Sequence, residues 1–225
     1  MLLSVIIPVF NEEKNIAQVI KAVDNVKIPK EIIVINDFSS DSSSEELKKF
    51  KLKNLKVINH PKNMGKGAAI RTGIKQATGD IILIQDADME YNPQDYYELV
   101  KPIENGQAKV VYGSRFKGTI KGMAFANLVA NKILTFTANF LYLINLTDEA
   151  TCYKVFRSEI LKKQKLKCNR FDFCPEITAK LSKQGIKIYE VPIHYNGRTK
   201  GEGKKIRWND GVSALWTLVK YRFTD

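Results

Sequence analysis

Three acidic side chains, Asp86, Asp88 and Glu90, stand within five positions after the apolar run of "GDIILIQDADMEYNP". Carboxylate oxygens are the ligands that Mg²⁺ and Mn²⁺ prefer, and such cations often complete their shell with substrate phosphates. In an extended segment the D-x-D spacing projects both carboxylates to the same side. The pattern favours a metal site at Asp86 and Asp88 with Glu90 as a third ligand. The alternative is a polar turn that caps a helix starting near Pro93.

Basic residues in three other segments could meet phosphates. Lys66 stands between two glycines in "HPKNMGKGAAIRTG", which is not a Walker A loop because His60 replaces its first Gly and no Ser or Thr follows the Lys. Arg115 in "GSRF" follows an expected strand, where its guanidinium could bind phosphate. In "NGRTKGEGKKIRWNDG", Arg198 and Lys204 stand among glycines, which suits a loop that closes over a polyanion. An ordinary helix start and a solvated charge run are the alternatives for the first and last segments.

Short runs rich in Val, Ile and Leu alternate with amphipathic stretches of helical period. Strands are expected at 3–7, 32–36, 55–58, 81–85 and 108–112, and helices at 12–24, 42–50, 66–77 and 94–104. This alternation predicts an α/β fold in which helices flank a mostly parallel sheet. Ligands of such sheets lie beyond the carboxyl ends of the strands. Glu12, Asp37, Asp86 and Asp88 should therefore gather at one edge, where a cation would offset their repulsion.

Residues 124–146, "AFANLVANKILTFTANFLYLINL", are apolar except for a polar stripe with a spacing of four. The stripe consists of Asn127, Asn131, Thr135 and Asn139. On a helix it forms one narrow face, and the wide apolar remainder suits a membrane interface. The C-terminal "IRWNDGVSALWTLVKYRF" mixes aromatic and basic residues as segments at lipid headgroups do. The alternative is that both helices pack on each other or in a dimer.

The 225 residues, 44% of them hydrophobic and 27% charged, suit one folded domain with a C-terminal extension. We expect residues 1–206 to form the domain, 123–146 to be its amphipathic helix and 207–225 a second amphipathic helix. The three cysteines lack paired short spacings, which argues against a zinc site and for a reducing compartment. Neither a signal peptide nor a spanning helix is expected. The net charge of +12 favours nucleic acid, anionic lipid or a phosphorylated small molecule as partner.

The motifs also resemble a known family. "SVIIPVFNEE", "VINDFSSD", "NMGKGAAIRTG", "GDIILIQDADMEYNP", "GSRF", "TDEATCYKVF", "FDFCPEI" and "EVPIHYNGRTKGEGKK" occur in the order seen in family 2 glycosyltransferases, specifically those like dolichol-phosphate mannose synthase. The resemblance spans nearly the whole chain. It implies a GT-A fold, a single Rossmann-like domain, and transfer of a sugar, with inversion, from a nucleotide-sugar donor to polyprenyl or dolichyl phosphate. The "GSRF" and "FDFCPEI" blocks point more narrowly to the polyprenyl phosphate acceptor than D-x-D does.

The resemblance also implies roles for single residues. The nucleotide base and ribose would contact Pro8, Phe10, Glu12, Ile35 and Asp37. Asp86 and Ala87 would touch the nucleotide sugar, and Asp86, Asp88 and Glu90 would surround Mg²⁺ or Mn²⁺ on its diphosphate. Lys66, Arg198 and Lys204 would meet donor phosphates, and Arg115 would bind phosphate at the junction of donor and acceptor. The residues expected to be catalytic are Asp88, Arg115 and Arg198.

This chain departs from the mannose synthase pattern at three places. Glu90 stands where Gln is common, R-x-x-G-x-S-K reads R-T-K-G-E-G-K-K, and Thr-Gly-Phe reads Thr151-Cys152-Tyr153. The donor therefore stays open between GDP-mannose and a UDP-sugar. A lipid phosphate is mostly dianionic at neutral pH and needs no general base. Neither of the two histidines, His60 and His194, is adjacent to the acidic cluster in the sequence.

Three alternatives remain at this stage. The same fold could transfer sugar to a soluble or glycan hydroxyl, with Asp148 or Asp172 as general base. A sugar-nucleotide-binding protein without turnover is the second. The third is a nucleic-acid-binding module, but no helix-turn-helix, zinc or RNA-binding motif supports it. We expect peripheral attachment to the cytoplasmic face of a membrane and no nucleic acid partner. Whether the apolar helices suffice or a partner protein supplies the anchor stays open.

Overall fold

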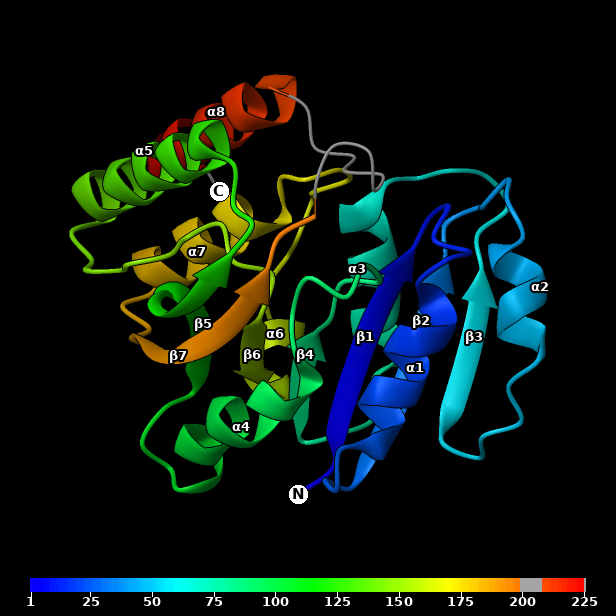
Figure 1. Ribbon diagram of the computed structural model, residues 1–225. Helices are drawn as coiled ribbons and strands as arrows, with labels where there is room; N and C mark the ends of the chain where they lie inside the picture. Colours follow the sequence, from blue (N-terminus) through cyan, green and yellow to red (C-terminus); the bar gives the residue numbers. More distant parts are fainter. Residues whose placement is uncertain (199–207, 225) are drawn as a thin grey trace.

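The computed structural model describes residues 1–198 and 208–224, and these form one seven-stranded sheet with helices on both faces (Figure 1). The order across the sheet is β3-β2-β1-β4-β6-β5-β7. The strands are β1 Leu3–Val9, β2 Lys30–Asn36, β3 Leu55–Asn59, β4 Ile81–Ile84, β5 Val110–Lys121, β6 Lys154–Arg157 and β7 Ile188–Asn196. The helices are α1 Ile16–Asn25, α2 Ser43–Lys48, α3 Lys66–Gln76, the 3₁₀ turn η1 Pro93–Asp95, α4 Tyr96–Glu104, α5 Phe125–Tyr142, α6 Ser158–Lys162, α7 Phe173–Lys183 and α8 Trp208–Phe223.

The sheet is mixed but mostly parallel, as predicted, and the half formed by β3, β2, β1 and β4 is wholly parallel. Strands β1 to β4 are parallel to their neighbours in that half, and β5 is parallel to β7. Strand β6 runs antiparallel to both β4 and β5. The chain passes through α5, beyond one end of the sheet, before it enters β6, so β6 runs back from that end (Figure 1).

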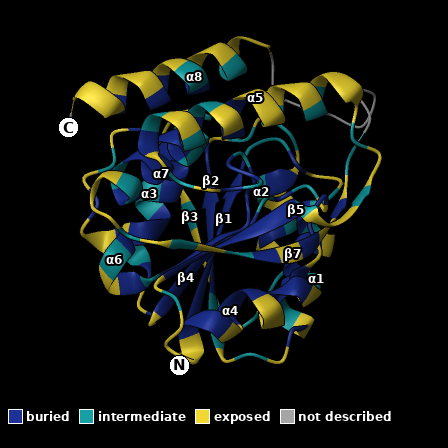
Figure 2. Cartoon of the chain, turned by 90° about the vertical axis from the view of Figure 1, so that its left-hand side faces the viewer, coloured by how far each residue is buried: buried dark blue, intermediate teal, exposed yellow. Residues whose placement is uncertain are grey.

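The centre of the sheet is apolar because helices cover both of its faces. All seven residues of β1 and all four of β4 are buried, as expected for strands enclosed between two helical layers. Figure 2 shows these strands as the buried interior of the molecule. Rigid strands of this kind fix where the loops at their carboxyl ends emerge, and those loops carry the predicted site.

Helix α1 begins at Ile16, four residues later than expected, because Asn11 is not its N-terminal cap. Asn11 instead adopts a left-handed conformation with φ of 51°. Its side-chain oxygen accepts a hydrogen bond from the backbone N–H of Ser40 at 2.8 Å. Asn11 therefore ties the loop after β1 to the loop after β2.

Helices α5 and α8 lie together at the end of the sheet toward which β1, β2 and β3 point (Figure 1). They pack on each other through a small apolar cluster. Its buried members on these two helices are Leu134, Ala138, Tyr142, Ala214, Leu218 and Tyr221. The alternative in which the two helices pack on each other is thus correct as far as this contact goes. No helix among residues 1–198 and 208–224 is long and apolar enough to cross a membrane.

Candidate functional site

The loops that follow β1, β2 and β4 each contain a residue with positive φ: Asn11 (51°), Phe38 (61°) and Met89 (59°). This conformation costs a residue other than glycine about 1–2 kcal/mol, and such strain concentrates at functional sites. At Met89 it turns the chain, so that residues 87–90 form a turn and a bend. The extended D-x-D segment that we predicted is therefore wrong. The turn is closed by Asp88, whose Oδ1 accepts a hydrogen bond from the backbone N–H of Glu90 at 3.2 Å.

Arg198, two residues after β7, brings acids from two loops together. Its Nη2 donates to Oδ2 of Asp88 at 2.9 Å, and its Nη1 donates to Oε2 of Glu12 at 3.3 Å. Its Nε lies 3.6 Å from Oε1 of Glu90. The Arg198 side chain is only 14% exposed. The structure thus assembles four residues that the sequence analysis placed in the site.

Glu90 holds the end of β7 against this cluster. Its Oε2 accepts a hydrogen bond from the hydroxyl of Tyr195 at 2.8 Å, and its Oε1 accepts one from the backbone N–H of Arg198 at 3.0 Å. The backbone carbonyl of Glu90 also accepts from the N–H of Asn196 at 2.8 Å. Both carboxylate oxygens of Glu90 accept a hydrogen bond, so a metal ion at Glu90 has to share an oxygen with one of these donors or replace it.

Asp86 is paired with Lys66, whose Nζ lies 2.5 Å from Oδ1 of Asp86. Burial opposes the charge of the Lys66 ammonium, but the carboxylate of Asp86 outweighs this and raises the pKa of Lys66 well above its usual value. Lys66 is therefore a fixed cation at the edge of the acidic cluster. A donor phosphate that binds Lys66 has to share it with Asp86.

The start of α3 is closed to phosphate. Helix N-termini commonly bind phosphate through their first N–H groups. Here the N–H groups of Gly67 and Ala68 donate to the carbonyls of Arg170 and Asn169 at 2.8 and 3.1 Å. The glycines beside Lys66 therefore serve close packing between α3 and residues 169–170, and the lysine side chain is the part of this loop that faces the site.

We predict that Gly65→Ala lowers the free energy of unfolding by about 3 kcal/mol. Gly65 has φ of +90°, and a Cβ there would overlap the carbonyl oxygen of Asn169. The backbone conformation contributes about 1–2 kcal/mol and the overlap a further 1–3. Gly106→Ala is the control, because Gly106 has φ of +72° with nothing within 4 Å of the new Cβ. Urea unfolding should give a loss of about 1 kcal/mol for the control; equal losses would contradict the packing role.

Asp37 organises the loop that carries Lys66. Its Oδ1 accepts from Nδ1 of His60 at 2.7 Å and from the N–H of Met64 at 2.8 Å, and its Oδ2 accepts from the N–H of Gly65 at 2.7 Å. Asp37 is 2% exposed. Its predicted contact with the nucleoside stays a prediction, and the carboxylate already has a structural role.

The other residues predicted to contact the nucleoside lie close to Asp37. Pro8 and Ile35 are direct partners in the pairing of β1 with β2, and both are buried. Phe10 is half-buried at the end of β1. Ala87 is buried in the turn before Asp88. Lys204 lies outside the described residues.

Arg115 is held by a buried carboxylate. Its Nε and Nη2 donate to the two oxygens of Asp148, both at 2.7 Å, and its backbone N–H donates to Oδ2 at 2.9 Å. The guanidinium carbon lies 5.2 Å from the centre of the Tyr195 ring. Tyr195 therefore contacts Arg115 with its ring and Glu90 with its hydroxyl, and so links the two residues. Asp148 is fully buried and occupied by Arg115, which makes it unsuitable as a general base.

Several residues that support the site were missing from the sequence analysis. Tyr96 and Tyr153 donate hydroxyl hydrogen bonds to Oε1 of Gln85 at 2.6 and 2.8 Å, and Nε2 of Gln85 donates to the carbonyl of Asp86 at 2.8 Å. All three side chains are buried. They fix the backbone of Asp86 from behind. The sequence did contain a signal for Gln85, because it is a polar residue at the carboxyl end of an apolar strand.

The cluster carries more negative than positive charge. Four carboxylates, those of Glu12, Asp86, Asp88 and Glu90, face the two cations of Lys66 and Arg198. Burial, together with the charges of Asp86 and Glu90, raises the pKa of Asp88 to about 7 although Arg198 opposes the shift. An oxygen-only donor set with excess negative charge suits Mg²⁺ or Mn²⁺. However, no three His, Cys, Asp or Glu side chains of the described part of the chain are already grouped to hold a metal ion.

We predict that Asp88→Asn makes the metal-free protein more stable at pH 8 but not at pH 4. The pKa of Asp88 is about 7 in the folded protein, against an ordinary value of 3.8. Ionisation of Asp88 therefore destabilises the wild-type fold as the pH rises from about 4 to about 7, and the variant escapes this loss. Melting temperatures in chelator, compared with those of Glu98→Gln on the exposed face of α4, test this. A difference between variant and wild type that stays constant with pH would refute it.

Comparisons with known proteins show which proteins this chain resembles in sequence and in fold. The model of glycosyl transferase family 2 matches residues 4–164. The chain is 34% identical to uncharacterized protein MJ1222 of Methanocaldococcus jannaschii, over 84% of this chain and 79% of that protein. It is 29% identical to dolichol-phosphate mannosyltransferase of Pyrococcus furiosus, over 91% of this chain and 59% of that protein. It is 32% identical to UDP-N-acetylglucosamine--dolichyl-phosphate N-acetylglucosaminyltransferase of Methanococcus voltae, over 85% and 84%.

Among solved structures, the chain resembles glucosyl-3-phosphoglycerate synthase of Mycobacterium tuberculosis in complex with Mn²⁺, UDP and phosphoglyceric acid. The TM-score is 0.76 at 19% identity, covering 100% of this chain and 79% of that chain. A complex of the same enzyme with Mg²⁺ and UDP gives a TM-score of 0.71 at 18% identity, covering 98% and 79%. At this level of identity the likeness establishes the fold.

Proposed function

Since the chain belongs to glycosyl transferase family 2 and has the predicted GT-A fold, we propose that it moves a sugar from a nucleotide-sugar donor to polyprenyl phosphate at a membrane surface. It is a glycosyltransferase by family; the acceptor and the membrane are the proposal. The observation that carries the proposal is an exposed apolar face on α5 and α8. These helices lie at the end of the sheet toward which β1 points, where the loops that carry the acidic cluster also emerge (Figure 1).

The residues on the donor side suit a nucleotide diphosphate. Asp86 and Asp88 would hold Mg²⁺ or Mn²⁺, with Glu90 as the candidate third ligand. When bound, such an ion supplies electrostatic stabilisation of the leaving diphosphate. Lys66 and Arg198 would add positive charge at the same place. Asp86 holds the Lys66 side chain there, and Glu90 holds the backbone of Arg198. The base and ribose would lie at the carboxyl ends of β1 and β2.

The residues on the acceptor side suit a phosphate nucleophile. A phosphate monoester is mostly dianionic at neutral pH and can attack without losing a proton to the protein. This agrees with the burial of Asp148, which is occupied by Arg115. Nη1 of Arg115 takes part in neither bond to Asp148 and could meet an acceptor phosphate oxygen. We propose this contact for Arg115, beside Tyr195.

Helix α5 exposes a largely apolar side, unlike a helix that faces water. Its polar stripe points inward, where the hydroxyl of Thr135 accepts from the N–H of Glu149 at 3.0 Å and Asn139 makes two hydrogen bonds of 2.8 Å with the backbone of Leu146. The side of α5 that points outward is largely apolar. Figure 2 shows that α8 also leaves one side exposed. The exposed apolar side chains are Phe125, Val129, Ile133, Phe136, Phe140 and Leu143 on or next to α5, and Trp208, Val212, Trp216, Val219 and Phe223 on α8.

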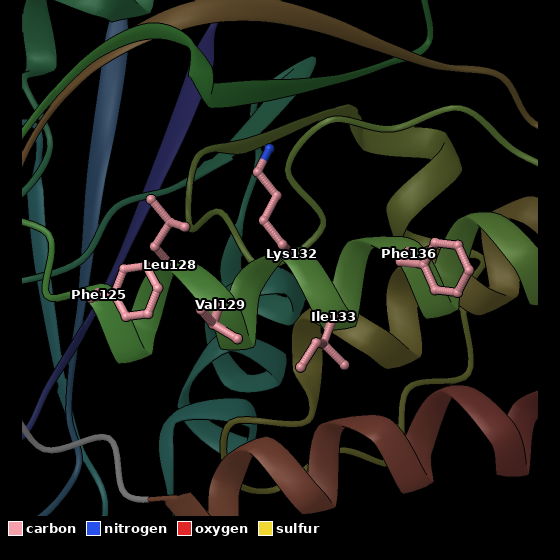
Figure 3. A pocket seen from close by; sticks show the side chains of 6 residues that line it. All are labelled: Phe125, Leu128, Val129, Lys132, Ile133 and Phe136. Carbon is pink, nitrogen blue, oxygen red and sulfur yellow. The ribbon is translucent and has the colours of Figure 1, made fainter.

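A shallow apolar pocket of about 450 Å³ runs along α5 on this face (Figure 3). It is lined by Phe125, Leu128, Val129, Lys132, Ile133 and Phe136. Lys132 is its one charged residue, and its Nζ lies 3.7 Å from the centre of the Phe116 ring. Aromatic and aliphatic side chains with a basic rim are typical of proteins that lie at a lipid headgroup region.

We predict that Phe136→Glu with Phe140→Glu reduces binding to anionic vesicles at least about tenfold. Each Phe, 69% and 71% exposed, should contribute about 1.5–3 kcal/mol when buried in lipid. Co-flotation with phosphatidylglycerol vesicles measures the binding. Tyr97→Glu with Tyr189→Glu is the matched control, because it adds the same charge at exposed aromatic residues away from α5 and α8. Equal loss in both double variants would contradict a specific membrane face.

The donor can be identified by thermal shift. Nucleotide sugars with uracil and guanine bases are added one at a time, with and without Mn²⁺. A true donor raises the melting temperature in proportion to the logarithm of its saturation, and we expect that rise to depend on Mn²⁺. If no nucleotide sugar shifts the melting temperature, the proposal that the protein uses a nucleotide-sugar donor is refuted. A donor that binds without any turnover in the presence of acceptors would instead indicate a sugar-nucleotide-binding protein.

A further inference from the structure

The guanidinium of Arg198 occupies a place among the carboxylates where a cation is expected. We propose that Arg198 and the divalent cation compete for these carboxylates, so that the metal ion binds tightly only once a nucleotide diphosphate draws Arg198 away. This inference rests on the proposed function, because it assumes that Asp88 is a metal ligand. It adds a rule for the order in which metal and donor bind.

Both oxygens of Asp88 are engaged in the described structure. Oδ2 accepts from Nη2 of Arg198 at 2.9 Å, and Oδ1 accepts from the N–H of Glu90 at 3.2 Å. The second bond closes the turn at Met89, so it belongs to the loop itself. Oδ2 is the oxygen that takes no part in the turn, so a metal ion that binds Asp88 through Oδ2 competes with Arg198 for it. Glu12 and Glu90 contact the same guanidinium at 3.3 and 3.6 Å, so its displacement breaks three ion pairs.

The backbone around Arg198 aims the side chain at Asp88. Glu90 binds the N–H of Arg198 and the hydroxyl of Tyr195 with its carboxylate, and the N–H of Asn196 with its carbonyl. The guanidinium is thus positioned before any ligand arrives. Because its side chain is 14% exposed and that of Asp88 15%, water screens this ion pair less than it screens a surface pair.

Charge explains why a nucleotide diphosphate would end the competition. A divalent cation that enters while Arg198 stays in place meets a like charge at short range, which opposes binding. A diphosphate adds negative charge and offers the guanidinium a new partner with matching geometry. Arg198 can then exchange Asp88 for phosphate oxygens, and the metal ion can take Asp88. Metal and nucleotide should therefore each strengthen the binding of the other.

The test measures binding of Mn²⁺ itself, by electron paramagnetic resonance of the free ion, for wild type and Arg198→Gln. Without nucleotide, the variant should bind Mn²⁺ about tenfold more tightly than wild type. With saturating UDP or GDP, wild type should gain at least tenfold in Mn²⁺ affinity, and the variant should gain less. Arg198→Lys keeps the charge but loses the planar guanidinium with its several N–H donors, and its Mn²⁺ affinity should lie between those of wild type and Arg198→Gln. Lys101→Gln, on the exposed face of α4, is the control for net charge.

Equal Mn²⁺ affinity of wild type and Arg198→Gln without nucleotide would overturn the competition but leave the proposed function standing. Tightening by Lys101→Gln to the same extent would also overturn it, because net charge alone would then be the cause. If no variant binds Mn²⁺ even with UDP or GDP, both the inference and the proposed metal role fail.

Discussion

Asp88→Asn should lower the rate of sugar transfer by about a thousandfold while the protein remains folded. Asp88 lies where Arg198, Glu12 and Glu90 meet, and it is a predicted ligand of the cation that stabilises the leaving diphosphate. Loss of a fixed electrostatic partner of a transition state typically costs a factor of 10²–10³. Initial rates with donor, acceptor and Mn²⁺ measure the effect, and circular dichroism reports on the fold.

Two controls make this result specific. Glu98→Gln removes a carboxylate from the exposed face of α4 and should leave the rate unchanged. Melting temperature at pH 8 in chelator should rise for Asp88→Asn, so that lost activity accompanies gained stability, as is common at functional sites. Near wild-type rates for Asp88→Asn, or full activity of wild type in chelator, would refute the role of Asp88 and of the metal.

Asp148→Ala should lower the free energy of unfolding by about 4 kcal/mol, because it leaves the guanidinium of Arg115 buried without its carboxylate. Asp148 is fully buried and Arg115 is 5% exposed, and three hydrogen bonds of 2.7 to 2.9 Å join them. For a chain of this length the melting temperature should fall by about 10 °C. Differential scanning calorimetry measures it.

A double-mutant cycle shows whether the lost ion pair is the cause. Arg115→Met with Asp148→Leu replaces the pair by apolar side chains and should recover most of the stability that Asp148→Ala loses, because no unpaired charge remains. The cycle is completed by Arg115→Met and Asp148→Leu measured singly. If their losses of stability simply add in the double variant, burial of an unpaired charge is not the explanation. The double variant should still transfer sugar to the acceptor more slowly than wild type, since Arg115 is absent.

Most of the first half of the fold could be predicted because its strands are continuous apolar runs enclosed by helices. Strand β6 was missed because it has four residues and begins with Lys154. That lysine is buried only because it donates to the carbonyl of Glu149 at 2.6 Å and lies 3.6 Å from the centre of the Tyr112 ring. Strand β7 was missed because it is not a continuous apolar run and contains Pro192, although its residues alternate between buried and exposed as in a half-buried strand. These features depend on tertiary contacts.

The residue types of the site could be predicted, but not their partners. The acids expected to converge were Glu12, Asp37, Asp86 and Asp88. Glu12 and Asp88 do meet at Arg198, together with Glu90. Asp86 pairs with Lys66 instead, and Asp37 pairs with His60. The pairing of Asp88 with Arg198 joins residues 110 positions apart, and nothing in the local sequence specifies it. The same is true of Arg115 and Asp148. The left-handed Met89 was also unexpected, because an extended segment explains D-x-D spacing equally well.

The acceptor assay tests the central claim most directly. The protein is incubated with Mn²⁺ and the radiolabelled nucleotide sugar that gave the thermal shift, together with a short polyprenyl phosphate, 3-phosphoglycerate or a free sugar. We predict that label moves into the organic phase with the polyprenyl phosphate, at a rate that chelator abolishes, and that the soluble acceptors give little product. Transfer to 3-phosphoglycerate or a free sugar, with no labelled lipid, would contradict the account.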